Sequence, residues 1–223
     1  MDFDYKRELQ RKGFHLLSLF YVFIFYIFFP YNSKLGLFIL TAILLFLIQV
    51  EFFRLELRKE IPIISMIYRR IARRKERNQL ASLVFTTIGI ILTFAIFDVR
   101  IATAAVLMMI FGDAIAALVD KKFGKHKIPR FENRSFEGFF SQLIVNLIIG
   151  IIFVKASYSL VPLFSFIKAT SFSGAIIWPA VLIMAFTATF VETVTRKIDD
   201  NLLIPLFAGF NGQLILIILN FFI

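Results

Sequence analysis

The chain has 223 residues, of which 59% are apolar and 30 are Phe, and its formal net charge is +10. Soluble domains are usually about 45–50% apolar, so this composition excludes an ordinary soluble domain and indicates an integral membrane protein. A basic face toward anionic lipids or anionic substrates explains the charge without a nucleic-acid partner. The absence of cysteine excludes disulfides and thiol ligands, and we expect one domain over residues 1–223.

Seven stretches are apolar enough to span a membrane, because a spanning helix needs about 20 mostly apolar residues. They lie at residues 14–30, 35–53, 80–97, 100–119, 138–154, 174–194 and 202–222. The sequence therefore predicts an all-α fold, a polytopic membrane helical bundle. Between the second and third stretches, Ile and Met residues interleave with Lys and Arg, which predicts a basic amphipathic helix on the cytoplasmic membrane surface.

Basic residues predict the orientation of this bundle. Of the 25 Lys and Arg, all but Lys34, Arg100, Lys155 and Lys168 fall in segments on one side of the predicted membrane. Short cytoplasmic loops carry an excess of Lys and Arg, so we expect the N-terminus in the cytoplasm and the C-terminus outside. The membrane is then the cell membrane or, in a eukaryote, one of the endoplasmic-reticulum type.

Ionisable side chains near the ends of the predicted spans gather at the cytoplasmic boundary. They are His15, Glu51, Asp113, Glu137, Glu192, Asp199 and Asp200. Pumps and transporters place such groups deep in the membrane, whereas the deep polar residues here, such as Asn146 and Thr187, are typical of interhelical hydrogen-bond partners. This pattern favours an interfacial site, and a transporter or a non-catalytic lipid-binding protein remains an alternative.

Asp113 is the most informative of these residues, because the apolar stretch continues for at least a turn beyond it. A carboxylate within a span is either functional or paired with a cation. Four lysines and an arginine follow in the next loop: Lys121, Lys122, Lys125, Lys127 and Arg134. This loop binds phosphates or only fixes the topology. Ser135 as a helix N-cap, with Glu137 in the first turn, would create an anion site where the fifth stretch begins.

Two further clusters flank this loop in the predicted topology. Two adjacent carboxylates and an amide, Asp199, Asp200 and Asn201, suit Mg²⁺ together with substrate phosphates, or form an acidic N-cap for the last helix. Glu192 and Arg196 are four residues apart and either take part in the site or form a structural pair. Near the N-terminus, one helical face carries Glu8, Arg11, Lys12 and His15. His15 is a candidate proton acceptor or a hydrogen-bonding anchor.

In this combination and order, these motifs resemble the CTP-dependent lipid kinases, which include dolichol kinase, phytol kinase and the CTP-using diacylglycerol kinase. The segments that carry the resemblance are Glu8-x-x-Arg11-Lys12-x-x-His15, Gly112-Asp113-Ala, Phe123-Gly124-Lys125-His-Lys127-Ile, Ser135-Phe-Glu137-Gly138 and Asp199-Asp200-Asn201 with Pro205. Members usually have Gly where this chain has Asp120, and Lys where it has Arg134. A more distant resemblance links the chain to phosphatidate cytidylyltransferases, whose Gly-His-Gly-Gly and Asp-Arg pattern is absent after Asp200.

The resemblance implies a kinase that uses CTP to phosphorylate the hydroxyl of a membrane lipid alcohol, such as a polyprenol, dolichol, phytol or diacylglycerol, in lipid metabolism. The alternative is a CDP-lipid synthase. The resemblance to the lipid kinases assigns Asp113 and His15 to catalysis, and it assigns Asp113, Asp199, Asp200 and Asn201 to Mg²⁺. Nucleotide and phosphate binding falls to Lys121, Lys122, Lys125, Lys127, Arg134, Ser135 and Glu137, and binding of the lipid headgroup to Arg11, Lys12, Glu192 and Arg196. A homo-oligomer is left open.

Overall fold

The computed structural model describes residues 12–13, 15–29, 32–56, 80–155, 174–196 and 198–222. In chain order the elements are α2 (Leu19–Phe28), α3 (Ser33–Leu55), α5 (Ser82–Ile96), α6 (Val99–Leu107), the π-helical turn η2 (Met108–Gly112), α7 (Asp113–Lys122), β1 (Lys127–Ile128), β2 (Phe131–Ser135), α8 (Phe136–Gly150), η3 (Ile151–Lys155), α9 (Gly174–Val194) and α10 (Asp200–Phe222). Arg11 and residues 57–79, which hold most of the predicted amphipathic helix, lie outside the described residues.

Each predicted apolar stretch coincides with a helix or a continuous helical run, which confirms the all-α membrane bundle. Five of these are long and apolar enough to cross a membrane: Lys34–Leu55, Val99–Lys122, Phe136–Val154, Ile177–Val194 and Asp200–Leu219. The helices α2 and α5 are equally apolar but shorter, with 10 and 15 residues. The fourth stretch forms α6, η2 and α7 in succession, so a π-helical turn lies directly before Asp113.

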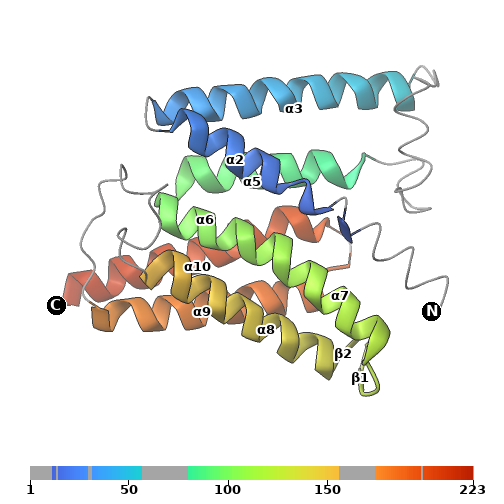
Figure 1. The fold of residues 1–223 in the computed structure, drawn as a ribbon, viewed down its shortest axis with the longest axis vertical. Helices are drawn as coiled ribbons and strands as arrows, with labels where there is room; N and C mark the ends of the chain where they lie inside the picture. The colour runs from blue at the N-terminus through green and yellow to red at the C-terminus, as the bar shows by residue number, and fades with distance from the viewer. Residues whose placement is uncertain are drawn as a thin grey trace.

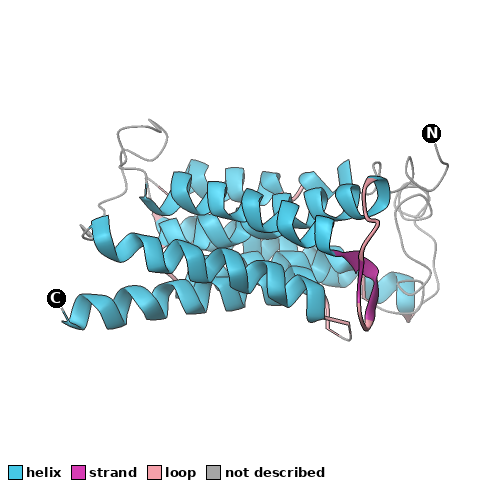
Figure 2. Cartoon of the chain, turned by 90° about the horizontal axis from the view of Figure 1, so that it is seen from below, coloured by secondary structure: helices cyan, strands magenta, loops and turns pink. Residues whose placement is uncertain are grey.

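The helices lie side by side along one direction, and successive helices run in alternating directions (Figures 1 and 2). The run from α6 to α7 is central: 78% of its apolar window is buried, against 17% for α3 at the periphery. Small residues of α6, Ala102, Ala104 and Ala105, are fully buried and allow α10 and η3 to approach closely. The central helix therefore positions Asp113 against several neighbours at once.

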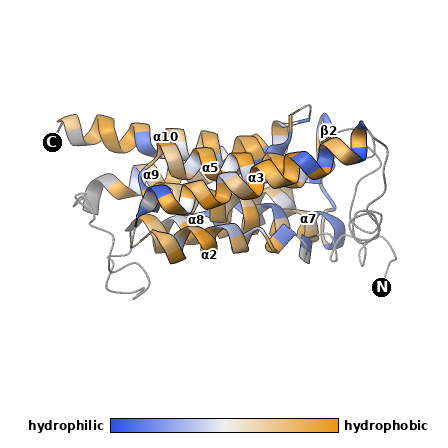
Figure 3. Ribbon diagram, turned by 90° about the horizontal axis from the view of Figure 1, so that it is seen from above, coloured by the Kyte–Doolittle hydropathy of each residue, from blue (hydrophilic) through white to orange (hydrophobic). Residues whose placement is uncertain are grey.

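Large apolar side chains cover the outside of the bundle, as expected where lipid replaces water. Phe38, Phe46, Phe186 and Phe210 are among the exposed ones, and Figure 3 shows hydrophobic colour along most of the helix length. Polar side chains gather instead at the ends, where they cap helices. The N-cap Asn32 accepts from the backbone N–H of Lys34 at 2.9 Å. Such a surface is matched to a bilayer and not to water.

Candidate active site

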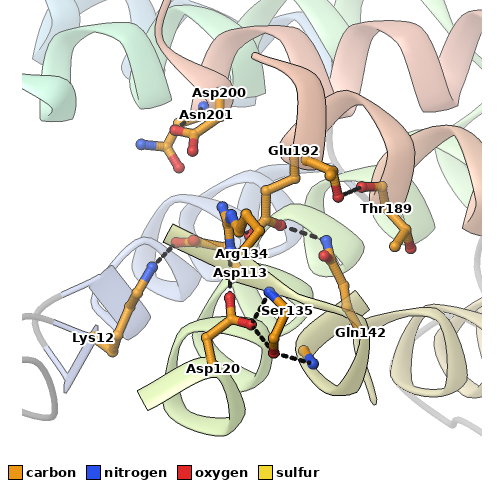
Figure 4. Close-up of polar contacts among 12 residues, drawn as sticks. Lys12, Asp113, Asp120, Arg134, Ser135, Gln142, Thr189, Glu192, Asp200 and Asn201 are labelled. Atoms are coloured by element: carbon orange, nitrogen blue, oxygen red, sulfur yellow. Dashed lines mark hydrogen bonds and ion pairs between the residues drawn. The ribbon is translucent and has the colours of Figure 1, made fainter. Parts of the chain in front are cut away.

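Charged side chains converge at the end of the bundle that carries the hairpin β1–β2, at the right in Figure 1. Figure 3 shows hydrophilic residues concentrated there. The short helical segment before α2, the end of α7, the start of α8, the end of α9 and the start of α10 all meet at this end. The antiparallel path of the chain thus brings together residues that are far apart in sequence, as the close-up in Figure 4 shows.

Asp113 begins α7 and is 7% exposed. Its Oδ2 atom accepts a hydrogen bond from Nζ of Lys12, so the two side chains form a buried ion pair. Nε2 of His15 lies 3.7 Å from the same oxygen. Lys12 and His15 are three residues apart and turn toward one carboxylate, as expected for residues that share a helical face. Asp113 therefore has a cationic partner and a titratable neighbour, both from the N-terminal segment.

Arg134, at the end of β2, lies between two carboxylates. Its Nη2 atom is 2.7 Å from Oε1 of Glu192, and its Nη1 atom is 3.6 Å from Oδ2 of Asp120. Burial alone would lower the pKa of Arg134, but the surrounding carboxylates outweigh burial and raise this pKa above its usual value. In decreasing strength they belong to Glu192, Asp113, Asp200 and Asp120. The guanidinium is thus a fixed cation at the centre of four acidic side chains.

Buried polar side chains of α8 and α9 pack next to Glu192 and hold it in place. Nε2 of Gln142 donates to Oε2 of Glu192, and one turn further along α8, Nδ2 of Asn146 donates to Oγ1 of Thr189 at 3.1 Å. The predicted interhelical role of Asn146 is confirmed. A Cβ atom at Gly112 would lie 2.6 Å from Oδ1 of Asn146 and 3.2 Å from Nε2 of Gln142, so this glycine allows the close approach of α8 to the central helix.

The acidic cluster before α10 has a capping geometry. The backbone N–H of Asn201 lies 3.0 Å from Oδ1 of Asp199 and 3.1 Å from Oδ1 of Asp200. Nδ2 of Asn201 donates to Oγ of Ser82 at 2.7 Å, whereas its Oδ1 atom is buried and has no hydrogen-bond partner. Asp200 interacts electrostatically with Arg134. Among the described residues, no three His, Asp or Glu side chains are grouped closely enough to hold a metal ion by themselves.

The basic loop folds into a hairpin, in which β1 and β2 pair in antiparallel fashion and Arg130 has a φ of 69°. Its four lysines are exposed and lie outside the buried cluster: Lys121, Lys122, Lys125 and Lys127. The predicted N-cap is confirmed, because Oγ of Ser135 accepts from the N–H of Gly138 at 3.1 Å. Glu137 turns toward the hairpin, where Oε1 lies 2.6 Å from Nδ1 of His126.

The residues predicted to bind the lipid headgroup do not all lie together in the structure. Lys12 and Glu192 belong to the buried cluster, whereas the guanidinium of Arg196 lies over the ring of Phe131, 4.7 Å from its centre. Glu192 pairs with Arg134 from the hairpin, so the structural pair considered for Glu192 and Arg196 is replaced by a tertiary one. The motif analysis missed Gln142, because a polar residue in a span gives no sign of its partner. Only the position of Gln142, about two turns into α8, indicates that it lies near the charged end of the bundle.

These features define an all-α membrane protein with a buried cluster of opposite charges at one end of its helices. The chain is 30% identical over 108 residues to a protein of Glycine max named "Probable phytol kinase 1, chloroplastic", an alignment that covers 48% of this chain and 33% of the relative. It is 30% identical over 117 residues to "Probable phytol kinase 2, chloroplastic" of Oryza sativa subsp. japonica, covering 52% and 36%. A third protein, "Probable phytol kinase 3, chloroplastic" of Glycine max, is 29% identical over 121 residues.

The chain thus spans about a third of the length of the curated relatives that it matches. No family model matches the chain, and no solved structure matches it. The names of these three relatives agree with the lipid kinase family that the motifs resemble.

Proposed function

We propose that this protein is a lipid kinase that transfers the γ-phosphate of CTP to the hydroxyl of a prenol-like membrane alcohol at the cytoplasmic face of the membrane. The observation that carries the proposal is the buried charged cluster at one end of an apolar bundle. A long-chain alcohol stays in the bilayer and a nucleotide stays in water, so their reaction needs a site at this boundary. The names of the relatives, all probable phytol kinases, support the same substrate class.

Phosphoryl transfer depends mainly on positioning and on electrostatic stabilisation of the transferred group. The exposed lysines of the hairpin region add positive charge at the same end of the bundle, suited to the triphosphate. Asp113 and His15 lie next to each other in the charged cluster, and either side chain can accept the proton that the alcohol loses. Lys12 holds the Asp113 carboxylate in place, and the outward-facing Phe side chains leave the apolar tail of the substrate in lipid.

The residues at the start of α10 fit a Mg²⁺ ion that is shared with the substrate. Magnesium favours oxygen ligands, usually one or two carboxylates together with phosphate oxygens. Asp200 offers a carboxylate, and Asn201 offers a buried carbonyl oxygen that has no hydrogen-bond partner, with its amide nitrogen fixed on Ser82. When bound, the metal would neutralise charge on the phosphates. Asp113 is already paired with Lys12, so we assign the metal to Asp200 and Asn201 first.

The test is to incubate the purified protein with CTP or ATP and with phytol, dolichol or diacylglycerol, and to identify both products. Formation of CDP and a phosphorylated alcohol supports the proposal. Pyrophosphate and a CDP-lipid would identify a cytidylyltransferase instead, and no turnover with any pair would favour a transporter or a lipid-binding protein.

Asp113→Asn should reduce turnover by at least about 100-fold, because it removes the negative charge that holds Lys12 and faces His15. Asp98→Asn is the matched control, since Asp98 pairs with Arg100 at 3.1 Å in the first turn of α6, away from the charged cluster. The control should retain wild-type turnover. Equal activity of the two variants would remove Asp113 from the site.

A further inference from the structure

The carboxylate of Asp120 joins three elements at the base of the cationic loop, residues 121–134. Oδ1 accepts a hydrogen bond from the backbone N–H of Ser135 at 2.8 Å and another from its hydroxyl at 2.6 Å. Oδ2 lies 3.6 Å from Nη1 of Arg134. The side chain of Asp120 is 6% exposed. One buried carboxylate therefore ties the last turn of α7 to both the end of β2 and the start of α8.

Two glycines allow the close packing around Asp120, one against its carboxylate and one against its backbone. A Cβ atom at Gly138 would lie 2.0 Å from Oδ1 of Asp120, and one at Gly124 would lie 2.3 Å from the backbone oxygen of Asp120 and 2.8 Å from Oγ of Ser135. Carbon and oxygen atoms do not approach this closely without a bond. The present position of the Asp120 carboxylate thus requires a residue without a side chain at position 138.

The same carboxylate occupies the anion-binding position that the sequence predicted at the start of α8. The N-terminus of a helix favours a negative charge because its first N–H groups point outward. Here the Asp120 carboxylate accepts hydrogen bonds from the backbone N–H and the hydroxyl of Ser135. Oγ of Ser135 in turn accepts a hydrogen bond from the N–H of Gly138. These donors are engaged within the protein. An incoming phosphate would therefore meet the exposed lysines of the loop before it could reach these donors.

We propose that Asp120 is a positioning residue that clasps the loop of residues 121–134 against the start of α8 and thereby sets the KM for the nucleoside triphosphate. This inference rests on the proposed kinase function. With the clasp in place, both ends of the loop are fixed before the nucleotide arrives, and Arg134 stays between Asp120 and Glu192. Without it, binding has to order the lysines, and ordering a loop on binding weakens affinity.

The experiment compares turnover kinetics of Asp120→Ala, Gly138→Ala and the double variant. Each single change should raise the KM for CTP by about tenfold with kcat within about threefold, because each breaks the hydrogen bonds that close the loop. The double variant should be no worse than Asp120→Ala alone, since alanine at 120 leaves room for a Cβ at 138. Asp120→Asn keeps the acceptor for Ser135 and should stay within about threefold of wild type.

Asp98→Ala is the matched control, because Asp98 also accepts a backbone N–H, that of Arg100 at 3.0 Å, and also pairs with an arginine. It should lower thermal stability without changing KM. A KM in Asp120→Ala equal to that of wild type, or a double variant in which the two effects add, would overturn the clasp while leaving the kinase intact.

Amide hydrogen exchange gives a readout that does not depend on turnover. Residues 121–134 should exchange faster in Asp120→Ala than in wild type or Asp120→Asn, and unchanged exchange would overturn the clasp. A wild-type protein without turnover would refute the proposed function, and the role in KM with it, whereas the exchange data would still decide whether Asp120 holds the loop.

Discussion

Replacement of Glu192 by glutamine tests whether the buried ion pair with Arg134 holds the charged cluster together. Oε1 of Glu192 forms an ion pair with Nη2 of Arg134 at 2.7 Å, and Oε2 accepts a hydrogen bond from Nε2 of Gln142. The glutamate side chain is fully buried. Neutralising one partner of a buried pair leaves the other charge uncompensated and costs about 3–5 kcal/mol. Arg134 keeps Asp120 at 3.6 Å, so we expect the lower end of this range.

A loss of about 3 kcal/mol corresponds to a fall in Tm of about 6–12 °C for a chain of this size. Thermal unfolding in detergent, followed by the fluorescence of the single tryptophan, Trp178 of α9, measures this shift. Glu137→Gln is the control, because the partner of Glu137 is the exposed His126 and surface pairs contribute little. It should leave the Tm unchanged.

A double-mutant cycle separates the pair from general damage. Arg134→Gln alone should also destabilise the protein, whereas the variant with both changes should lose less than the sum of the single losses. A fall in Tm below about 2 °C in Glu192→Gln, which corresponds to less than about 1 kcal/mol, would refute the reasoning. Strict additivity in the cycle would refute it as well.

Gly112→Ala should destabilise the protein by about 1–3 kcal/mol, because the new Cβ would lie 2.6 Å from Oδ1 of Asn146. Gly13→Ala should leave the stability unchanged, because no atom lies within 4 Å of its Cβ position. Thermal unfolding of the two variants measures the difference. The absence of native cysteine also allows single-cysteine labelling of the orientation. A membrane-impermeant maleimide should label Lys34→Cys in intact cells and Lys125→Cys only after permeabilisation. The reverse pattern would invert the proposed topology.

The helices could be predicted from the sequence because membrane spans impose a length and a composition on each segment. Every predicted stretch is helical, and Ser135 caps its helix as its side chain suggested. The π-helical turn at Met108–Gly112, which packs against α8, has no signal of this kind in the sequence. The sequence likewise predicts only a basic loop where the structure has the hairpin β1–β2.

The members of the candidate site could be selected from the sequence, but their partners could not. An acidic residue in a membrane span usually pairs with a cation, but the sequence around Asp113 does not indicate that this cation is Lys12. Likewise, Glu192 has Arg196 at helical spacing but pairs with Arg134 from the hairpin. In the sequence Asp120 is only a departure from the pattern of the family that the motifs resemble, and only the structure places Ser135 and Gly138 around it.

The charge balance of the cluster gives an independent argument for a divalent cation. Four carboxylates, those of Asp113, Asp120, Glu192 and Asp200, surround Arg134, and Lys12 supplies the second permanent positive charge. The described cluster is therefore short of two positive charges when all four carboxylates are ionised and His15 is neutral. Buried charges that are not compensated are costly, so a site of this composition should bind a small divalent ion more strongly than monovalent salt.

Magnesium should consequently stabilise the protein in the absence of any nucleotide. A ligand at about 100 times its Kd stabilises the folded state by about 2.7 kcal/mol, so Mg²⁺ near saturation should raise the Tm by about 5 °C or more. Sodium chloride at matched ionic strength controls for screening. Asp200→Asn should abolish the Mg²⁺ shift, whereas Asp98→Asn should keep it. An equal response to both salts, or a full Mg²⁺ shift in Asp200→Asn, would show that Asp200 holds no metal, because the stabilisation then does not depend on its charge.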